Sequence, residues 1–197
     1  RVRRQRQMCI RDSFHAATRE LSPYPIGGHD NQKYDIRSLL LDGDHLWIGT
    51  YAKGIRVVNL RTGAVKVYTH SRGIPYTICS NDVLCFYRGR NGEIYVGTSW
   101  GLCRYDAAKD NFMPIINIGS MISITDMHED MYNHLWIATS SSGVFTYNTI
   151  NGHYKNYQHE REDSTTITSN SIITLFEDVK GTMWFGTNGG GLCSFDA

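Results

Sequence analysis

Apolar and polar positions alternate along this chain in short runs, and the runs return at regular intervals. Alternating runs occupy residues 35–42, 81–88, 123–130 and 171–178. Each is followed by an almost wholly apolar phrase that ends in threonine: LWIGT at 46–50, IYVGT at 94–98, LWIAT at 135–139 and MWFGT at 183–187. A side-chain period of two is typical of β-strands, and no segment with a helical period is long enough to compete. The pattern predicts an all-β chain of short strands.

Residues that favour turns separate these runs. Asn91-Gly92 and Lys180-Gly181 each lie between an alternating run and the phrase that follows it. Asn-Gly is a strong hairpin signal because both central residues of a type I′ turn need a positive φ. A later turn, at Thr62-Gly63 in the first copy and Asn151-Gly152 in the third, leads into a further alternating segment. Each copy therefore predicts four short antiparallel strands joined by hairpins.

The four copies align on the aromatic residue of the phrase, at spacings of 48, 41 and 48 residues. Four antiparallel strands in a unit of roughly 40 to 50 residues are typical of a β-propeller blade. We expect blades at 34–78, 79–120, 121–168 and 169–197, with the last blade truncated before its fourth strand. Residues 14–33 are expected to be the end of a preceding blade and its loop, which makes the chain a propeller fragment.

The repeated phrase has a structural explanation. The second strand of a blade is covered on both faces by its neighbours, so it can be apolar throughout, and its glycine or alanine lets the next blade approach closely. Its threonine favours an extended backbone and can cap the following turn. We therefore assign packing roles to the repeat positions Trp47, Tyr95, Trp136, Trp184, Gly49, Gly97 and Gly186.

Composition restricts the class of protein to which the chain can belong. Hydrophobic residues make up 41% of the 197 and charged residues 20%, which is compatible with a buried core. No stretch reaches the ~20 consecutive apolar residues of a membrane span, and no signal-peptide pattern is present.

The basic segment 1–13, RVRRQRQMCIRDS, differs in character from the rest of the chain. It back-translates to a sequence that resembles a transposon-end sequencing adapter, and we expect it to lie outside the fold; a basic arm for nucleic acid or anionic lipid is the alternative. Without its five Arg and one Asp, 15 basic residues face 18 acidic ones, a net charge of −3. That balance argues against a nucleic-acid partner.

The last copy, SIITLFEDVKGTMWFGTNGGGLCSFD at 171–196, resembles the two-component regulator propeller repeat, whose pattern runs V-x-x-I-x-E-D-x-x-G-x-L-W-I-G-T-x-x-G-G-L-x-x-Y-D. The resemblance extends over residues 35–197 in four copies. The second copy departs from it with Tyr95 in place of Trp and Arg88-Gly89 in place of Glu-Asp. The first copy is one residue short at its first turn.

This resemblance implies a role and a setting. Proteins of the family carry such a propeller outside the inner membrane, as the sensor of a hybrid histidine kinase, and many detect oligosaccharides from dietary or host glycans in gut Bacteroidetes. It implies a periplasmic location, a seven-bladed parent propeller and, as partners, the remaining blades, the downstream sensor modules and a second copy in a homodimer. No kinase, ATP-binding or receiver motif occurs in this chain, so we expect a sensing segment without catalysis or a cofactor.

The variable loops are the candidate ligand site. In propellers, the connections between second and third strands and those between blades line one rim of the central channel. Aromatic faces that stack on sugars, and polar groups that bind hydroxyls, sulfates or carboxylates, suit an oligosaccharide there. The two sets of loops contribute Tyr51, Lys53, Trp100, Ser141 and Asn188, and then His70, Arg72, Tyr76, His159 and Arg161. Trp100 is the strongest candidate because an exposed Trp beside a blade-opening glycine has no evident packing duty.

The sequence gives little support for a metal site or for a disulfide framework. The stretch HEDMYNH at 128–134 lacks the spacing of a metal motif, and its Glu129-Asp130 pair recurs in the fourth copy, so we predict structural carboxylates and no metal site. Cys103 and Cys193 share a register position and are expected to be small buried side chains. The cysteine spacing predicts no disulfide framework.

Two alternative functions stay open. Propeller rims also bind proteins, so an interaction scaffold is one alternative. A propeller glycosidase or lyase is the other, because EDVKGTMW at 177–184 resembles the Asp-box of such enzymes. Its spacing is wrong, however, since Asp178 lies three residues before Gly181 where the box needs two.

Overall fold

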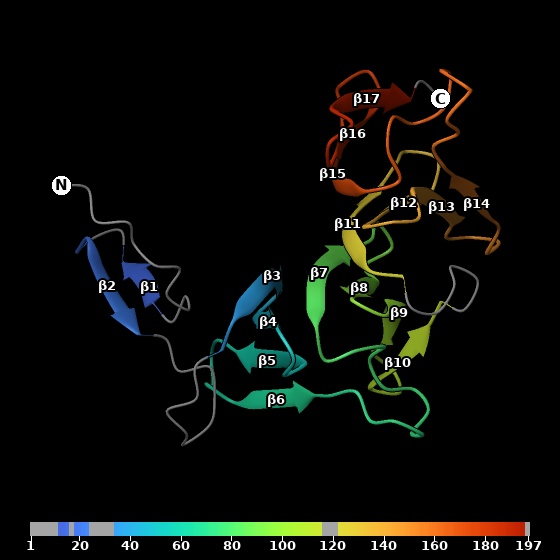
Figure 1. Cartoon of the computed structure of the whole chain (residues 1–197). Coiled ribbons are helices and arrows are strands. Elements are labelled where there is room, and N and C mark those ends of the chain that lie inside the picture. Colours follow the sequence, from blue (N-terminus) through green and yellow to red (C-terminus); the bar gives the residue numbers. More distant parts are fainter. Residues whose placement is uncertain (1–11, 16–17, 24–33, 116–121, 196–197) are drawn as a thin grey trace.

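The computed structural model describes residues 12–15, 18–23, 34–115 and 122–195. These residues form four antiparallel sheets of three or four strands that follow one another along the sequence, preceded by a two-stranded sheet (Figure 1). The preceding sheet pairs β1 (Asp12–His15) with β2 (Glu20–Pro23). It thus includes the last two residues of the basic segment, whose residues 1–11 lie outside the described part, as do 24–33 of the expected preceding loop.

Each of the four sheets is built from consecutive hairpins, as the turn pattern predicts. The first contains β3 (Ile36–Asp42), β4 (His45–Thr50), β5 (Ile55–Asn59) and β6 (Val65–Tyr68). The second contains β7 (Val83–Arg88), β8 (Ile94–Thr98), β9 (Gly101–Asp106) and β10 (Asn111–Pro114). The third contains β11 (Ile124–Glu129), β12 (His134–Thr139), β13 (Val144–Asn148) and β14 (Tyr154–Tyr157). The fourth contains β15 (Ile172–Glu177), β16 (Met183–Thr187) and β17 (Leu192–Phe195).

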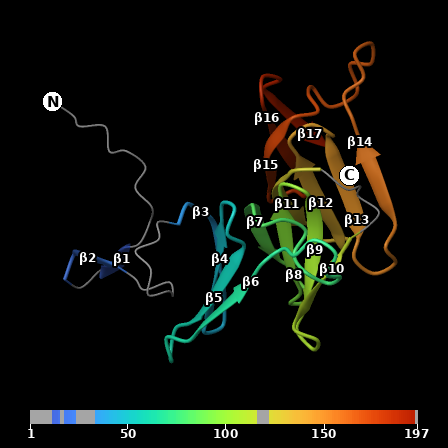
Figure 2. The same ribbon diagram turned by 60° about the horizontal axis from the view of Figure 1, so that its bottom comes forward.

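The first strands of the four sheets lie together. Strand β3 contacts β7, β7 contacts β11 and β11 contacts β15. The later strands of each sheet extend outward from this inner row, which both views show (Figure 1 and Figure 2). This is the blade arrangement of a propeller, so the predicted fold class is confirmed.

The repeated phrase forms the second strand of each sheet and supplies the core between sheets. Trp47 is 4% exposed, Tyr95 1% and Trp136 4%, whereas Trp184 is half-buried. A Cβ on Gly49 would lie 2.8 Å from Val83 Cγ1 in the next sheet, which is too close for a carbon contact. Gly49 therefore lets the first two sheets approach each other closely.

The four sheets also form two successive pairs that repeat after 89 residues. A bulge in β3 places Ser38 Oγ where it accepts a hydrogen bond from Phe86 N of the second sheet, at 3.2 Å. A bulge in β11 places Asp126 Oδ2 where it accepts from Leu175 N of the fourth sheet, at 2.8 Å. We call β3–β10 the first pair and β11–β17 the second pair. Phe86 N and Leu175 N are equivalent positions 89 residues apart. A hydroxyl accepts from the first and a carboxylate accepts from the second.

Candidate functional site

The threonine of each phrase shapes the loop that follows it. Thr50 Oγ1 donates to Gly54 O at 2.7 Å, and the same bond closes the loop after each of the other three phrases. These bonds run from Thr98 to Gly101 O, from Thr139 to Gly143 O and from Thr187 to Gly191 O, at 2.8, 2.7 and 2.8 Å. The predicted capping role of the threonine is confirmed.

Backbone hydrogen bonds bring these loops and the connections between sheets to the same end of the strands. The N–H of the residue after each threonine donates to the carbonyl of the residue before the first strand. The four bonds are Tyr51 to Asp35, Ser99 to Asp82, Ser140 to Ser123 and Asn188 to Ser171, at 2.8 to 3.1 Å. The backbone N–H groups of Gly54 and Gly143 donate to Asn81 O and Asn170 O, which lie in the connections between sheets. We call this end, with residues 51–54, 69–82, 99–100, 140–143, 158–171 and 188–191, the loop rim.

The structure places the first set of predicted ligand residues on the loop rim. Trp100 is 58% exposed and Tyr51 50%, and Ser141 and Asn188 are exposed as well. The Trp100 ring stacks on no other aromatic ring of the described residues. Lys53 is half-buried, with its ammonium 5.1 Å from the centre of the Tyr34 ring. Of this set, Trp100 offers the largest free aromatic face.

The second set divides into exposed residues and loop anchors. Arg72, Tyr76 and Arg161 are exposed. His70 instead holds its loop closed: its Nδ1 donates to Ile78 O at 2.8 Å, and its backbone N donates to Asn81 Oδ1 at 2.6 Å. His159 repeats both bonds 89 residues later, with Ile167 O at 2.8 Å and Asn170 Oδ1 at 2.7 Å. The geometry therefore gives both histidines a structural task that their predicted ligand role did not include.

Charged groups gather where the rim meets the inner strands of the first pair. The Arg37 guanidinium lies 3.6 Å from the Asp35 carboxylate and 5.2 Å from the centre of the Tyr51 ring. Burial raises the pKa of Asp82, and Asp35 adds to that rise while Arg37 opposes it. Asp82 Oδ1 is buried without a hydrogen-bond partner among the described residues. This corner offers a ligand the exposed Arg37 guanidinium and Asp35 carboxylate beside the Tyr51 ring.

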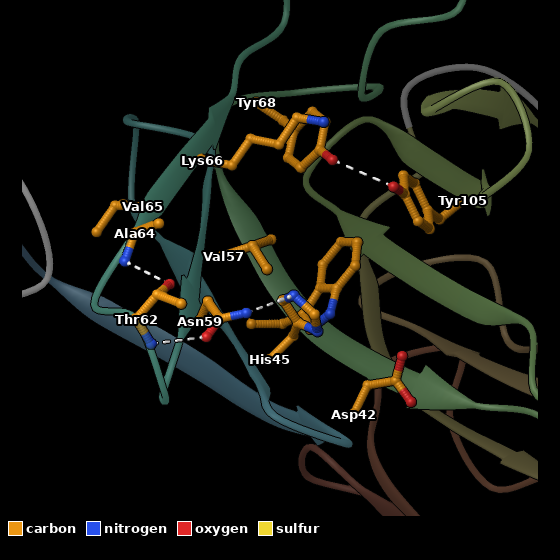
Figure 3. Close-up of a pocket in the computed structure, with 11 residues that line it drawn as sticks. Asp42, His45, Val57, Asn59, Thr62, Ala64, Val65, Lys66, Tyr68 and Tyr105 are labelled. Carbon is orange, nitrogen blue, oxygen red and sulfur yellow. Dashed lines mark hydrogen bonds between the residues drawn. The ribbon is translucent and has the colours of Figure 1, made fainter.

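Two grooves of similar size lie at the other end of the strands, away from the loops predicted to bind a ligand. The groove beside Trp47 has a volume of about 390 Å³ and the groove beside Trp136 about 380 Å³. The first is lined by Asp42, His45, Trp47, Val57, Asn59, Thr62, Ala64, Val65, Lys66, Tyr68 and Tyr105. In Figure 3, Tyr68 and Tyr105 face each other across it with hydroxyl groups 3.2 Å apart, and Asn59 Nδ2 donates to His45 Nε2 at 3.3 Å.

The sequence contains a signal for these grooves. His45, Trp47, Asn59, Lys66 and Tyr68 recur 89 residues later, as His134, Trp136, Asn148, Lys155 and Tyr157. The period spans two blades, so a comparison of single blades does not find it.

A hydrogen-bond network closes one side of the Trp47 groove. The Asp110 carboxylate pairs with Lys66 and accepts from the hydroxyls of Tyr68 and of Tyr105, the latter at 2.7 Å. The Lys66 ammonium, with help from the two hydroxyls, lowers the pKa of Asp110 to about 2. Burial and the bond to Asp110 raise the pKa of Tyr68. The network joins the outer strands of the first two sheets.

The remaining clustered carboxylates have structural partners. The carboxylates of Glu129 and Asp130 hold the fold: Glu129 Oε2 accepts from Arg90 N at 2.7 Å, and Asp130 Oδ2 accepts from Trp136 Nε1 at 2.8 Å. No group of three metal-ligating side chains occurs in the described ranges. Nor does any helix in that part of the chain have the length and apolar character of a membrane crossing.

The repeat and the fold of this chain are both similar to those of known proteins. Residues 166–189 match the family described as two component regulator propeller. The fold resembles the extracellular domain of a hybrid two component system from B. thetaiotaomicron, with a TM-score of 0.76 and 25% identity. That match covers 92% of this chain and 23% of the other. A second such domain from the same organism, at 21% identity and a TM-score of 0.56, covers 85% of this chain and 28% of the other and shows the fold alone.

A curated relative agrees with these matches. A histidine kinase of Formosa agariphila is 35% identical over 75 residues, which are 38% of this chain and 5% of the kinase. The chain therefore spans only a small part of the relatives it matches. Residues 166–189 thus resemble a two component regulator propeller repeat, and the chain has the fold of part of the extracellular domain of a hybrid two component system.

Proposed function

We propose that this chain is part of the periplasmic sensor of a hybrid histidine kinase, and that its loop rim binds an oligosaccharide whose presence regulates glycan use. The observation that carries the proposal is Trp100, a 58% exposed indole on the rim of a fold shared with extracellular domains of two component systems. Flat aromatic faces stack on the apolar faces of sugar rings, and a free indole offers the largest such face. Kinase activity then belongs to other modules of the parent protein, which is expected to act as a homodimer.

The neighbouring rim residues have the polarity that such a ligand needs. Tyr51 and Tyr76 are 50% and 53% exposed, and Arg37 lies behind the Tyr51 ring. Guanidinium groups bind carboxylates and sulfates in a bidentate manner, while phenol and amide groups bind hydroxyls. The proposed ligand is therefore an oligosaccharide that stacks on Trp100 and places polar or anionic substituents toward Tyr51 and Arg37.

Isothermal titration calorimetry of the 197-residue chain with neutral, uronate-containing and sulfated oligosaccharides tests this proposal. Trp100→Ala should weaken binding of the best oligosaccharide by roughly five- to thirty-fold, since stacking contributes about 1 to 2 kcal/mol. Tyr132→Ala is the matched control, because Tyr132 is also 58% exposed but lies in the turn between β11 and β12, away from the rim. The control should leave affinity unchanged. Equal effects of the two variants, or no binding by any probe, would contradict a rim site.

A protein-binding scaffold is the second candidate, and a particular surface favours it. Met131, Tyr132, Ile150 and Tyr154 are 59%, 58%, 77% and 50% exposed and come from two turns and one strand of the third sheet. Exposed apolar side chains that gather on one face often mark a protein contact. Under this alternative Tyr132→Ala, and not Trp100→Ala, weakens capture of a protein partner. Release of shortened sugars during the titration would point instead to a glycosidase or lyase.

A further inference from the structure

Two cysteines, one in a connection between sheets and one in a strand, pack in the same apolar cluster. Cys79 lies in the connection 69–82, and Cys103 lies on β9 of the second sheet. Cys103 is fully buried in the apolar cluster that also contains Trp47 and Ile78, and Cys79 packs against the same cluster while remaining partly exposed. Each thiol lies near enough to the other to shift its pKa. Both are reduced in the structure.

The second pair of sheets shows that the fold itself brings these two positions together. Thr168 follows Cys79 by 89 residues, and Cys193 takes the register position of Cys103. Thr168 Oγ1 donates to Cys193 Sγ at 3.7 Å. The connection between sheets and the third strand of the next sheet therefore place a side chain against a sulfur in both pairs. Only the first pair has a thiol on each side.

The loop holds Cys79 in place. His70 Nδ1 donates to Ile78 O at 2.8 Å, and Ile78 is fully buried. On the other side of Cys79, Asn81 Oδ1 accepts from His70 N at 2.6 Å. Cys79 thus lies between two anchored residues, so its approach to Cys103 does not depend on a freely moving loop.

We propose that Cys79 and Cys103 form a disulfide when the chain meets an oxidising compartment, and that this bond fastens the 69–82 connection to the second sheet. The oxidant is a disulfide donor such as glutathione disulfide. The Cys79 thiolate attacks it, which forms a mixed disulfide and releases one glutathione thiolate. Cys103 then gives up its proton, its sulfur attacks the Cys79 sulfur, and a second glutathione thiolate leaves. Two cysteine thiols are oxidised and one glutathione disulfide is reduced to two thiols.

The order of these steps follows from the surroundings of the two sulfurs. Cys79 is the more exposed of the two residues, and the neighbouring Cys103 thiol lowers its pKa although burial opposes the change. The interaction with Cys79, and then burial, raise the pKa of Cys103. The accessible, more acidic thiol therefore reacts first with the donor, and the buried thiol completes the bond.

The test uses the 197-residue chain with Cys9→Ser, incubated with glutathione disulfide, alkylated and digested for mass spectrometry without reduction. We expect a linked peptide that joins Cys79 and Cys103, and a thermal midpoint raised by roughly 5 to 10 °C that falls back with dithiothreitol. Cys79→Thr, which copies the residue of the second pair, should abolish both effects. Thr168→Cys should create a second linked peptide with Cys193.

Two results would overturn the proposal. One is a folded chain in which Cys79 and Cys103 stay unlinked while Cys79 carries glutathione. The other is a linked peptide that forms equally well in urea, since pairing would then not depend on the fold. Far-ultraviolet circular dichroism of each variant shows whether the sheets are retained, and Cys79→Ser supplies a second substitution at the same position.

Discussion

The first and third sheets share a His, an Asn, a Lys and a Tyr around a buried Trp, yet the indole N–H of that Trp has different partners in the two sheets. In the third sheet, Trp136 Nε1 donates to Asp130 Oδ2 at 2.8 Å. In the first sheet, Trp47 Nε1 is buried and has no hydrogen-bond partner among the described residues. The fourth sheet follows the third, because Trp184 Nε1 donates to Asp178 Oδ2 at 3.1 Å. The two Trp residues are equally buried, so the difference lies in the carboxylate.

One missing residue in a turn accounts for the difference. In the first sheet Asp42 pairs directly with His45, whereas in the third sheet the paired strands end at Glu129 and Leu135 and leave Asp130 inside the turn. Asp130 Oδ1 then accepts from the backbone N of Tyr132 and His134, at 2.8 and 2.9 Å. The Asp42 carboxylate instead lies 3.1 Å from the Arg88 guanidinium of the next sheet. We call the hydrogen bond from the Trp136 indole to Asp130 the indole cap. In the first sheet the turn is shorter, and an exposed ion pair between sheets takes the place of this cap.

The largest expected effect comes from removing the two carboxylates in turn. Asp130→Ala leaves the indole N–H and two backbone N–H groups without their acceptor and should lower the free energy of unfolding by about 2 to 4 kcal/mol. Asp42→Ala removes a solvent-exposed ion pair and should cost less than about 1 kcal/mol. Urea unfolding followed by Trp fluorescence measures both. Equal losses would mean that the indole cap does not stabilise the third sheet.

The sequence predicts the sheets well because every blade repeats the same local signals. The hairpin turns, the apolar second strands and the capping threonines each depend on residues close together in the chain. The shorter first turn is also visible in the sequence, at Asp42 and His45. The effect of the shorter turn on hydrogen bonding is not visible there, because the direction in which the Asp42 carboxylate points depends on Arg88, which lies in another sheet.

The candidate site is predicted less completely, for a related reason. Strand order alone places Trp100 and Tyr51 on the loop rim, but it cannot show that the His70 ring turns back to Ile78 O. The groove beside Trp47 is assembled from all four strands of the first sheet and from β9 of the second, so it has no local signal. Its only trace in the sequence is the 89-residue recurrence, which becomes informative once two blades are compared as one unit.

The second-largest expected effect comes from replacing the two Trp residues themselves. Replacing either with Phe removes similar buried area, so the packing cost should be nearly equal in the two variants. Trp136→Phe also leaves the Asp130 carboxylate without its indole donor, whereas Trp47→Phe removes an N–H that had no partner. Trp136→Phe should therefore lower the free energy of unfolding by about 1 to 2 kcal/mol more than Trp47→Phe. Chemical denaturation of the two variants in parallel checks this, and a smaller loss for Trp136→Phe would contradict it.

The smallest effect is the pH dependence of the same cap. Burial by itself would raise the pKa of Asp130, but the hydrogen bonds from the Trp136 indole and from the backbone of His134 and Tyr132 bring it below its usual value. A carboxyl group whose pKa is lower in the folded state stabilises the fold fully above its unfolded pKa, near 4, and loses that contribution as the pH falls through the folded pKa. The difference in unfolding free energy between the unmodified chain and Asp130→Asn should therefore be constant from about pH 7 to 5 and narrow below about pH 4. Asp42→Asn is the matched control and should differ little from the unmodified chain throughout. A difference for Asp130→Asn that stays constant or widens in acid would show that the ionised carboxylate is not what holds the Trp136 indole.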